Sequence, residues 1–382
     1  MSKRPRDDGA ASSLTADEIS AILAQNDERD IPTLDAGGVK RLLLVLERAV
    51  TANAALRARH AAEPLKYLDS EVRLSEALKS LQGLAAAPEH YGELPRSGVL
   101  ATLLGLLGHE NADVAMGVFE LLGELLGEDD EEGVVEEAAG RLVDALVADG
   151  GLEQLLQGAA RLGDAAARAA AAGRGGGGGG GGGEAGALEA DNLARDAEGL
   201  LTALVLVGRA VELRPALAKE FLRALPTARG TPLLLATLFA QLQPAPFSEV
   251  KGAAAELLCD LLAVGGLEAA RAVGGGAHAF PARAQPLSGT ECLLEALAPY
   301  RKRGPEGVEE KEFVSNLFDA LCTCLVRLSG AAHPSPPHPT PFTPSLFSSH
   351  LPRPPTLTQP APPLRSCKAK TWAASSRQRA QS

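Results

Sequence analysis

Side chains able to do chemistry are present, but their spacing does not match a catalytic site. The consecutive acids 129–132 point in different directions, whereas a general acid–base pair needs carboxylates that face one substrate. Cys322 and Cys324 fall on different faces of a helix, fit neither a metal nor a redox motif, and are expected to be buried or partly buried. No histidine lies at ligand spacing from a cysteine or an acid. We therefore expect no catalytic, metal or cofactor site and no enzymatic activity.

Acidic side chains recur at equivalent places in three leucine-rich stretches. Residues 113–126, 249–262 and 312–325 have apolar residues at helical spacing, and their acids fall on the opposite, polar face. A row of carboxylates on neighbouring helices would bind the Lys and Arg side chains of an extended basic peptide. The alternative is an ordinary solvated face. The candidate binding residues are Glu120, Glu124, Glu256, Asp260 and Asp319.

The same stretches are copies of one repeat. The first two are 136 positions apart, which is close to three units of roughly 45 residues, the period of armadillo and HEAT repeats. One helix pair cannot bury its leucine face alone, so neighbouring pairs stack. The sequence predicts an all-α, armadillo/HEAT-like α-solenoid rather than a compact bundle. In armadillo repeats the third helix of each unit lines the groove, where the candidate acids would then lie.

Composition supports this fold and limits the partners. Hydrophobic residues make up 45% of the chain and aromatic residues 3%, so the core is built from Leu, Val and Ala, which disfavours an all-β fold. The net charge is −11, and the charged residues after Gly330 are all basic, so the remainder is more acidic still. An acidic body repels nucleic-acid phosphates and attracts basic peptides, so no direct nucleic-acid binding is expected. No apolar run approaches the roughly 20 residues of a membrane span.

The pattern divides the chain into three parts. Residues 1–14 are a basic N-terminus predicted to be disordered, residues 15–328 are the helical repeat domain, and residues 329–382 are a Pro-rich tail also predicted to be disordered. Ala- and Gly-rich segments at about 164–187 and 265–289 are expected to be loose inserts. Helices are expected at 15–25, 39–59, 68–86, 98–107, 113–126, 134–148, 151–162, 188–212, 216–224, 232–243, 248–263, 291–297 and 309–328.

Several stretches resemble the β-catenin-like protein 1 family, which consists of nuclear armadillo proteins associated with the spliceosome. They are 103–114, 141–147 and 316–325, and the opening residues 3–8 resemble that family's basic N-terminal signal. The resemblance covers roughly residues 36–328 in the same order. The chain differs from the family in three features. The family's long acidic N-terminal region is nearly absent, Gly-rich inserts are present, and a Pro-rich tail stands after Leu328 where family members have further repeats.

The resemblance implies a non-enzymatic adaptor of the pre-mRNA splicing machinery. Family members are associated with the nineteen complex and bind basic, nuclear-localisation-type segments of splicing proteins. We therefore expect a nuclear scaffold with such partners, no membrane association and no cofactor. The candidate nuclear-localisation residues are Lys3, Arg4 and Arg6.

Two alternatives stay open. An importin-type transport adaptor would carry regular Trp/Asn pairs in its groove, and the single tryptophan, Trp372, lies in the tail. A cytoplasmic armadillo scaffold would share the fold but not the nuclear location. The sequence makes no prediction about the oligomeric state.

Overall fold

Helices account for most of the chain that the computed structural model describes, which is residues 34–127, 133–175, 184–228, 230–243, 246–275, 277–278 and 287–332. The α-helices are α2 (Ala36–Arg59), α3 (Leu68–Leu81), α4 (Glu93–Ser97), α5 (Val99–Leu106), α6 (Ala112–Leu126), α7 (Val134–Ala148), α8 (Gly151–Gly175), α9 (Glu184–Leu213), α10 (Leu217–Phe221), α11 (Leu233–Gln241), α12 (Glu249–Gly275), α13 (Gly289–Leu297) and α14 (Gly307–Ala332). Short 3-10 helices are η1 (Pro64–Lys66), η2 (Gln82–Ala86), η3 (Pro88–His90) and η4 (Ala298–Arg301). Strands β1 (Ala277–His278) and β2 (Leu287–Ser288) pair antiparallel, with Ala277 opposite Ser288.

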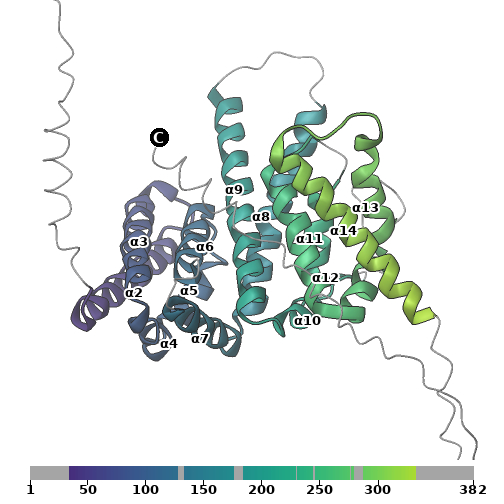
Figure 1. Ribbon diagram of the computed structural model, residues 1–382. Helices are drawn as coiled ribbons and strands as arrows, with labels where there is room; N and C mark the ends of the chain where they lie inside the picture. The colour runs from purple at the N-terminus through teal and green to yellow at the C-terminus, as the bar shows by residue number, and fades with distance from the viewer. Residues whose placement is uncertain are drawn as a thin grey trace, which may run out of the picture. The chain divides into compact units, whose positions relative to one another are not determined.

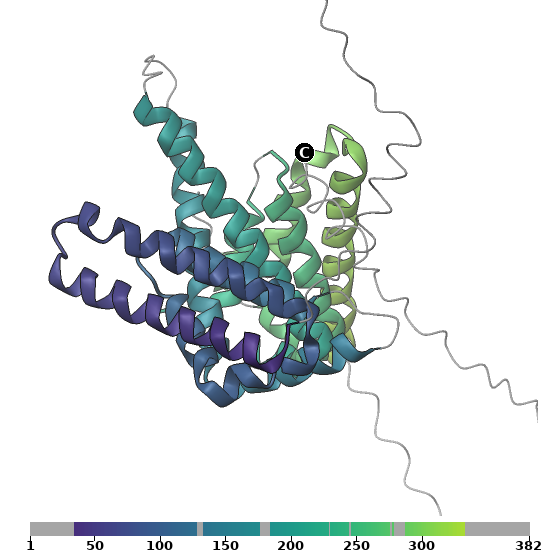
Figure 2. The ribbon, with the colours of Figure 1, turned by 90° about the vertical axis from the view of Figure 1, so that its left-hand side faces the viewer.

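The helices stack in two rows that follow the order of the chain. In one row α3 contacts α6, α6 contacts α9, α9 contacts α12, and α12 contacts α14; these five are called the ladder helices below. In the other row α5 contacts α8 and α8 contacts α11. Figure 1 shows the succession from purple to yellow, and Figure 2 shows α2 and α3 lying side by side at its start. The predicted all-α armadillo-like stack is confirmed.

The spacing of the repeat differs from the sequence prediction. Residues 113–126 lie in α6 and residues 249–262 lie in α12, and one ladder helix, α9, lies between them. The offset of 136 residues therefore spans two repeat units rather than three. The unit that ends in α9 is longer than an average repeat because α8 and α9 are unusually long and the glycine-rich segment joins them.

The ladder helices α6 and α9 bury large apolar side chains at the same two places, defined by aligning their leucine patterns. Phe119 of α6 and Leu204 of α9 are fully buried at the first place, and Leu126 and Val211 at the second. The ring of Phe119 packs so close to α8 that a Cβ added at Gly158 would lie 3.0 Å from its Cζ atom. Hydrophobic burial between successive helices therefore holds the stack together.

Arginines connect two of the units to the one before them. Arg161 of α8 donates hydrogen bonds to the carbonyl oxygens of Leu107 (2.7 Å) and His109 (2.8 Å), just after α5. Arg209 of α9 donates from Nε to the carbonyl of Leu126, the last residue of α6, at 3.1 Å. Arg327 of α14 donates in the same way to Leu262 of α12. The acceptors of Arg161 and Arg209 lie at or just after the C-terminal ends of α5 and α6, where carbonyls have no partner within the helix and the helix dipole favours a cation.

Two helices extend furthest beyond their predicted ends. The helix expected to end at 162 runs to Gly175, because the Ala-rich residues 164–173 are strong helix formers. The helix expected to end at 263 runs to Gly275, with a break at Gly266, whose φ of 66° and ψ of −144° favour glycine. The predicted helix at 15–25, the acids 129–132, Lys3, Arg4, Arg6 and the Pro-rich residues from 333 onward lie outside the described residues.

Residues 307–330 of α14 are long and apolar enough to cross a membrane, by length and composition only, which corrects the sequence expectation that no segment qualifies. One face of this helix packs against α12 and buries Phe313, Leu317 and Leu321. Asp319 and Arg327 lie within the same stretch.

We expect Phe119→Ala to lower the free energy of unfolding by about 3–5 kcal/mol, because it opens a cavity between α6 and α8. Urea denaturation at low protein concentration measures the change. Phe318→Ala is the matched control, because Phe318 occupies the same place on α14 but is 52% exposed. A control loss as large as that of Phe119→Ala would contradict the packing described here.

Candidate functional site: an acidic face on the ladder helices

The first cluster of the predicted acids lies on α6. Glu120 and Glu124 are both exposed there, one helical turn apart. Partial burial raises the pKa of Glu120, and the charge of Glu198 on α9 raises it further, while Lys79 of α3 opposes the shift. Side chains of three successive ladder helices therefore act on one another here. Glu120, Glu124 and Glu198 form what we call the α6 cluster.

The second cluster lies on α12 and is less exposed. Burial, followed by the nearby charges of Glu256 and Glu212, raises the pKa of Asp260 to about 7. Burial also raises the pKa of Glu256, with contributions from Glu212 of α9 and Glu312 of α14. Glu212, Glu256, Asp260 and Glu312 form the α12 cluster, in which carboxylates from three ladder helices lie close enough for their charges to raise the pKa values of Glu256 and Asp260.

Between the clusters, α9 does not continue the acidic pattern. Leu204 and Val211 of α9 align with the buried Phe119 and Leu126 of α6. In this alignment Val205 and Arg209 occupy the places of the two acids of α6. Arg209 donates to Leu126 and also pairs with Glu212, with Nη1 and Oε2 3.1 Å apart. The acidic face therefore consists of two clusters separated by a cation, and not of one unbroken row.

The fifth candidate, Asp319, is exposed on α14. It stands at the place that Glu256 occupies on α12, yet it is not among the charges that shift the carboxyl groups of the α12 cluster. The structure thus brings four of the five predicted acids into two clusters and leaves Asp319 outside them.

Sequence reasoning missed three members of the acidic face. Glu198 and Glu212 belong to α9, and Glu312 was not proposed as a binding residue although it lies in the third repeat copy. The leucine spacing of α9 matches that of α6, so the sequence does contain the pattern of another repeat copy. The copy is difficult to recognise because Val205 and Arg209 replace the acids that mark the others.

The cysteines lie on opposite faces of α14, as predicted. Cys324 is buried, and burial raises the pKa of its thiol to about 11, which leaves it protonated and inert. Cys322 is exposed, which corrects the expectation that both would be at least partly buried. Within the described ranges no three His, Cys, Asp or Glu side chains are placed to hold a metal ion.

The stretch 109–113, part of the segment that resembles the spliceosome-associated family, forms a polar junction. The Asn111 side chain accepts from the backbone N–H of Asp113, which caps α6, and donates to Glu71 of α3 at 2.9 Å. Glu71 also pairs with Arg57 of α2, and His109 bonds to Asn53 of α2 at 3.1 Å. This stretch therefore joins the first three long helices and has a structural role.

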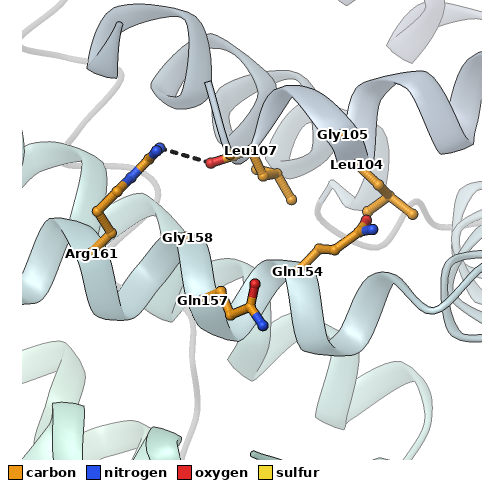
Figure 3. A pocket seen from close by; sticks show the side chains of 8 residues that line it. Leu104, Gly105, Leu107, Gln154, Gln157, Gly158 and Arg161 are labelled. Atoms are coloured by element: carbon orange, nitrogen blue, oxygen red, sulfur yellow. Dashed lines mark hydrogen bonds between the residues drawn. The ribbon is translucent and has the colours of Figure 1, made fainter. Parts of the chain in front are cut away.

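A pocket of about 250 Å³ lies elsewhere, between α5 and α8 (Figure 3). Gly105 and Gly158 leave room for it, Gln154 and Gln157 line it, and Arg161 reaches across toward the carbonyl of Leu107. The Oε1 atom of Gln154 is buried without a hydrogen-bond partner. None of the acids of the two clusters lines this pocket.

The fold and the acidic face together define a class: an armadillo-type stack of helices that exposes clustered carboxylates. The chain belongs to the family described as catenin-beta-like, Arm-motif containing nuclear, whose sequence pattern matches residues 17–332.

Curated relatives agree with this assignment. The chain is 30% identical over 298 residues to mouse (Mus musculus) beta-catenin-like protein 1, covering 78% of this chain and 44% of that protein. It is 24% identical over 307 residues to the beta-catenin-like protein 1 homolog of Schizosaccharomyces pombe, covering 80% of this chain and 46% of that protein. The chain thus spans less than half the length of these relatives.

Among solved structures, a designed armadillo repeat protein is similar at 16% sequence identity. The match covers 66% of this chain and 93% of the designed chain, with a TM-score of 0.29. The fold assignment depends on the contacts between ladder helices and on the family, and not on this match.

We expect Asp260→Asn to stabilise the protein more at pH 8 than at pH 5. A carboxyl whose pKa is raised on folding costs stability progressively as the pH rises from the unfolded value of 3.8 to the folded value of about 7, because the unfolded chain ionises in this range while the folded carboxyl, beside Glu256 and Glu212, stays protonated. The gain at pH 8 exceeds the gain at pH 5 by about 2–3 kcal/mol. Urea denaturation at both pH values measures it.

Asp144→Asn is the control, because this substitution is expected to destabilise the protein instead of stabilising it. Hydrogen bonds from Arg214, at 2.7 Å to each carboxylate oxygen, lower the pKa of Asp144. This exposed ion pair stabilises the protein at pH values above the usual pKa of an aspartate. Removing the pair is therefore expected to lower the free energy of unfolding by less than about 1 kcal/mol at pH 8. Equal effects of Asp260→Asn at pH 5 and pH 8 would refute the buried charge cluster.

Proposed function

We propose that this protein is a non-enzymatic nuclear scaffold of the pre-mRNA splicing machinery that binds basic, nuclear-localisation-type segments of partner proteins on its acidic face. The observation that carries the binding part is the pair of acidic clusters on α6 and α12. Membership of a family described as nuclear supports the location. The splicing role, with proteins of the nineteen complex as partners, is supported by the resemblance of the quoted stretches.

The geometry of the clusters suits a peptide with two separate groups of basic residues. Packed helices lie about 8–10 Å apart, so α6 and α12, with α9 between them, are roughly 20 Å apart. An extended chain covers that distance in about six residues. Arg209, between the clusters, would repel a cation at the middle of the peptide. The preferred ligand therefore has Lys or Arg at both ends of a short uncharged spacer.

The two clusters are expected to contribute differently to peptide binding, because one is exposed and the other is partly buried. The α6 cluster is exposed, so its attraction for Lys or Arg is screened by salt. The α12 cluster is partly buried, and a peptide cation there would relieve the repulsion that raises the pKa of Asp260. Each charge-assisted contact in such a sheltered place contributes about 1.5–3 kcal/mol.

Reversing the charge of Glu120, Glu124, Glu256 and Asp260 together to Lys is expected to weaken binding of a two-cluster basic peptide at least about 100-fold at low salt. Fluorescence anisotropy with a labelled peptide measures the affinity. The matched control reverses four exposed acids on or next to α7 and α8 and changes the net charge equally: Glu136, Glu137, Asp149 and Glu153.

The control is expected to keep most of the affinity, since those acids lie on or next to α7 and α8 and belong to neither acidic cluster. An equal loss in both variants would mean that overall charge, and not the acidic face, attracts the peptide. Unchanged affinity in the first variant would eliminate the proposed site. Circular dichroism confirms that each variant is folded.

Replacing Lys3, Arg4 and Arg6 by Ala is expected to shift a fluorescently tagged chain from the nucleus to the cytoplasm, because these residues form its candidate import signal. Microscopy of the tagged chain and of the variant measures the ratio of nuclear to cytoplasmic signal. A cytoplasmic signal from both the parent chain and the variant would contradict the nuclear assignment and favour a cytoplasmic scaffold. Peptide binding in vitro is expected to be unchanged.

A further inference from the structure

The pocket between α5 and α8 lies on the row formed by α5, α8 and α11, whereas the acidic clusters lie on the ladder helices. Its volume is about 250 Å³, and it is partly open to solvent. An engineered protein cavity of about 150 Å³ holds benzene, so this space has room for a two-ring group such as an indole. It is smaller than most small-molecule sites, which start at about 300 Å³. A single side chain of a partner protein therefore fits its size best.

Glycines on both helices leave this space open. A Cβ added at Gly158 of α8 would lie 3.0 Å from Cζ of Phe119, so packing requires a glycine there. The described residues give no such reason for Gly105 of α5, because a Cβ added there would meet none of their atoms within 4 Å. Glycine inside a helix nevertheless reduces its stability relative to alanine. The open space beside Gly105 belongs to the pocket, and Leu104 and Leu107 form the apolar wall.

Gln154 of α8 supplies an unused hydrogen-bond acceptor. Figure 3 shows its side chain and that of Arg161 extending from α8 toward α5 at opposite ends of the pocket. The Oε1 atom of Gln154 is buried and has no hydrogen-bond partner within the described part of the chain. A buried acceptor without a donor reduces stability, and the terminal torsion of a glutamine turns easily. A ligand whose N–H or O–H group reaches this oxygen therefore removes that cost.

Arg161 favours a neutral aromatic ring in the pocket. Its Nη1 and Nη2 atoms donate to the carbonyls of His109 and Leu107, at 2.8 and 2.7 Å, so the guanidinium group is already held in place. A guanidinium attracts the face of an aromatic ring, and a group that is already fixed loses little entropy in the contact. Its charge repels a cationic ligand, while the C-terminal end of α5 repels an anionic one.

We infer that the pocket binds the indole side chain of a tryptophan on a partner protein, with the ring N–H donating to Oε1 of Gln154. The indole fills the volume between Leu104, Leu107 and Arg161. Tryptophan is prominent in protein interfaces because it combines a large apolar ring with one polar group that needs a partner. The site lies on other helices than the acidic face, so this contact goes beyond the proposed binding of basic segments and does not depend on it.

Ligand-observed NMR with N-acetyltryptophanamide as the probe tests the inference on the full chain. We expect saturable binding at millimolar concentrations. The benzothiophene analogue of the probe has sulfur in place of the ring N–H and nearly the same shape. It is expected to bind about 3- to 10-fold more weakly, which corresponds to one hydrogen bond. No saturable binding of the probe would mean that the pocket holds only water and would overturn the inference.

Gln154→Met tests the hydrogen bond. Methionine has a similar length and no amide, so the probe and its benzothiophene analogue are expected to bind this variant equally. Gln157→Met is the matched control, because Gln157 lines the same pocket but is exposed, and it is expected to keep the preference of the parent chain. A preference for the probe that survives in Gln154→Met would contradict the role given to Oε1.

Gly105→Leu tests the location of the site. The larger side chain is expected to take up the space of the ring and to weaken probe binding at least about tenfold. Gly123→Leu on α6 is the matched control, because a Cβ added at Gly123 would also meet no described atom within 4 Å, and Gly123 does not line the pocket. Circular dichroism confirms that both variants are folded. Equal probe binding by Gly105→Leu and the parent chain would place the probe elsewhere and refute the inference.

The two binding activities can be measured separately. Gly105→Leu is expected to bind the two-cluster basic peptide as tightly as the parent chain does, because no acid of either cluster lines the pocket. The variant with four reversed charges on the acidic face is expected to bind N-acetyltryptophanamide as the parent chain does. Either proposal can therefore fail while the other holds.

Discussion

Every internal ladder helix must bury apolar side chains on two sides, and the rest of the structure depends on this requirement. Phe119 and Leu126 of α6 are covered only because further helices pack on α6, and the same holds for Leu204 and Val211 of α9. Hydrophobic burial on two sides requires each internal unit to have a neighbour on both sides. The stack therefore grows in the order of the chain, and only the faces that no helix covers are free for binding.

Polar groups are arranged to fit between these apolar contacts. Arg161 and Arg209 donate to carbonyls at or just after helix ends, and Asn111 caps α6 while bonding to Glu71 of α3. The acids of the two clusters have a different role, since burial and mutual repulsion raise the pKa values of Glu256 and Asp260 and so reduce stability at neutral pH. A cluster that costs stability is typical of a binding surface, where a ligand of opposite charge removes the cost.

Periodic features were predictable from the sequence, and contacts between repeats were not. The α6 helix was predicted to within one residue because its leucines fall at helical spacing, and the opposite orientations of Cys322 and Cys324 followed from the angle between successive helical residues. The place of α9 in the ladder was missed because Val205 and Arg209 replace the acids that mark the other copies. Glu198 and Glu212 join the clusters only through contacts with neighbouring helices, which no local pattern records.

The arginine that separates the two clusters also fixes how the helices are positioned along their axes. A movement of α9 along α6 by a single residue, a shift of about 1.5 Å, would disturb the hydrogen bond from Arg209 to Leu126, which is 3.1 Å long. Arg327 imposes the same limit on α14 and α12. Sliding is thereby opposed at the contact of α6 with α9 and at the contact of α12 with α14, which keeps the acids that these helices contribute to each cluster at a fixed separation.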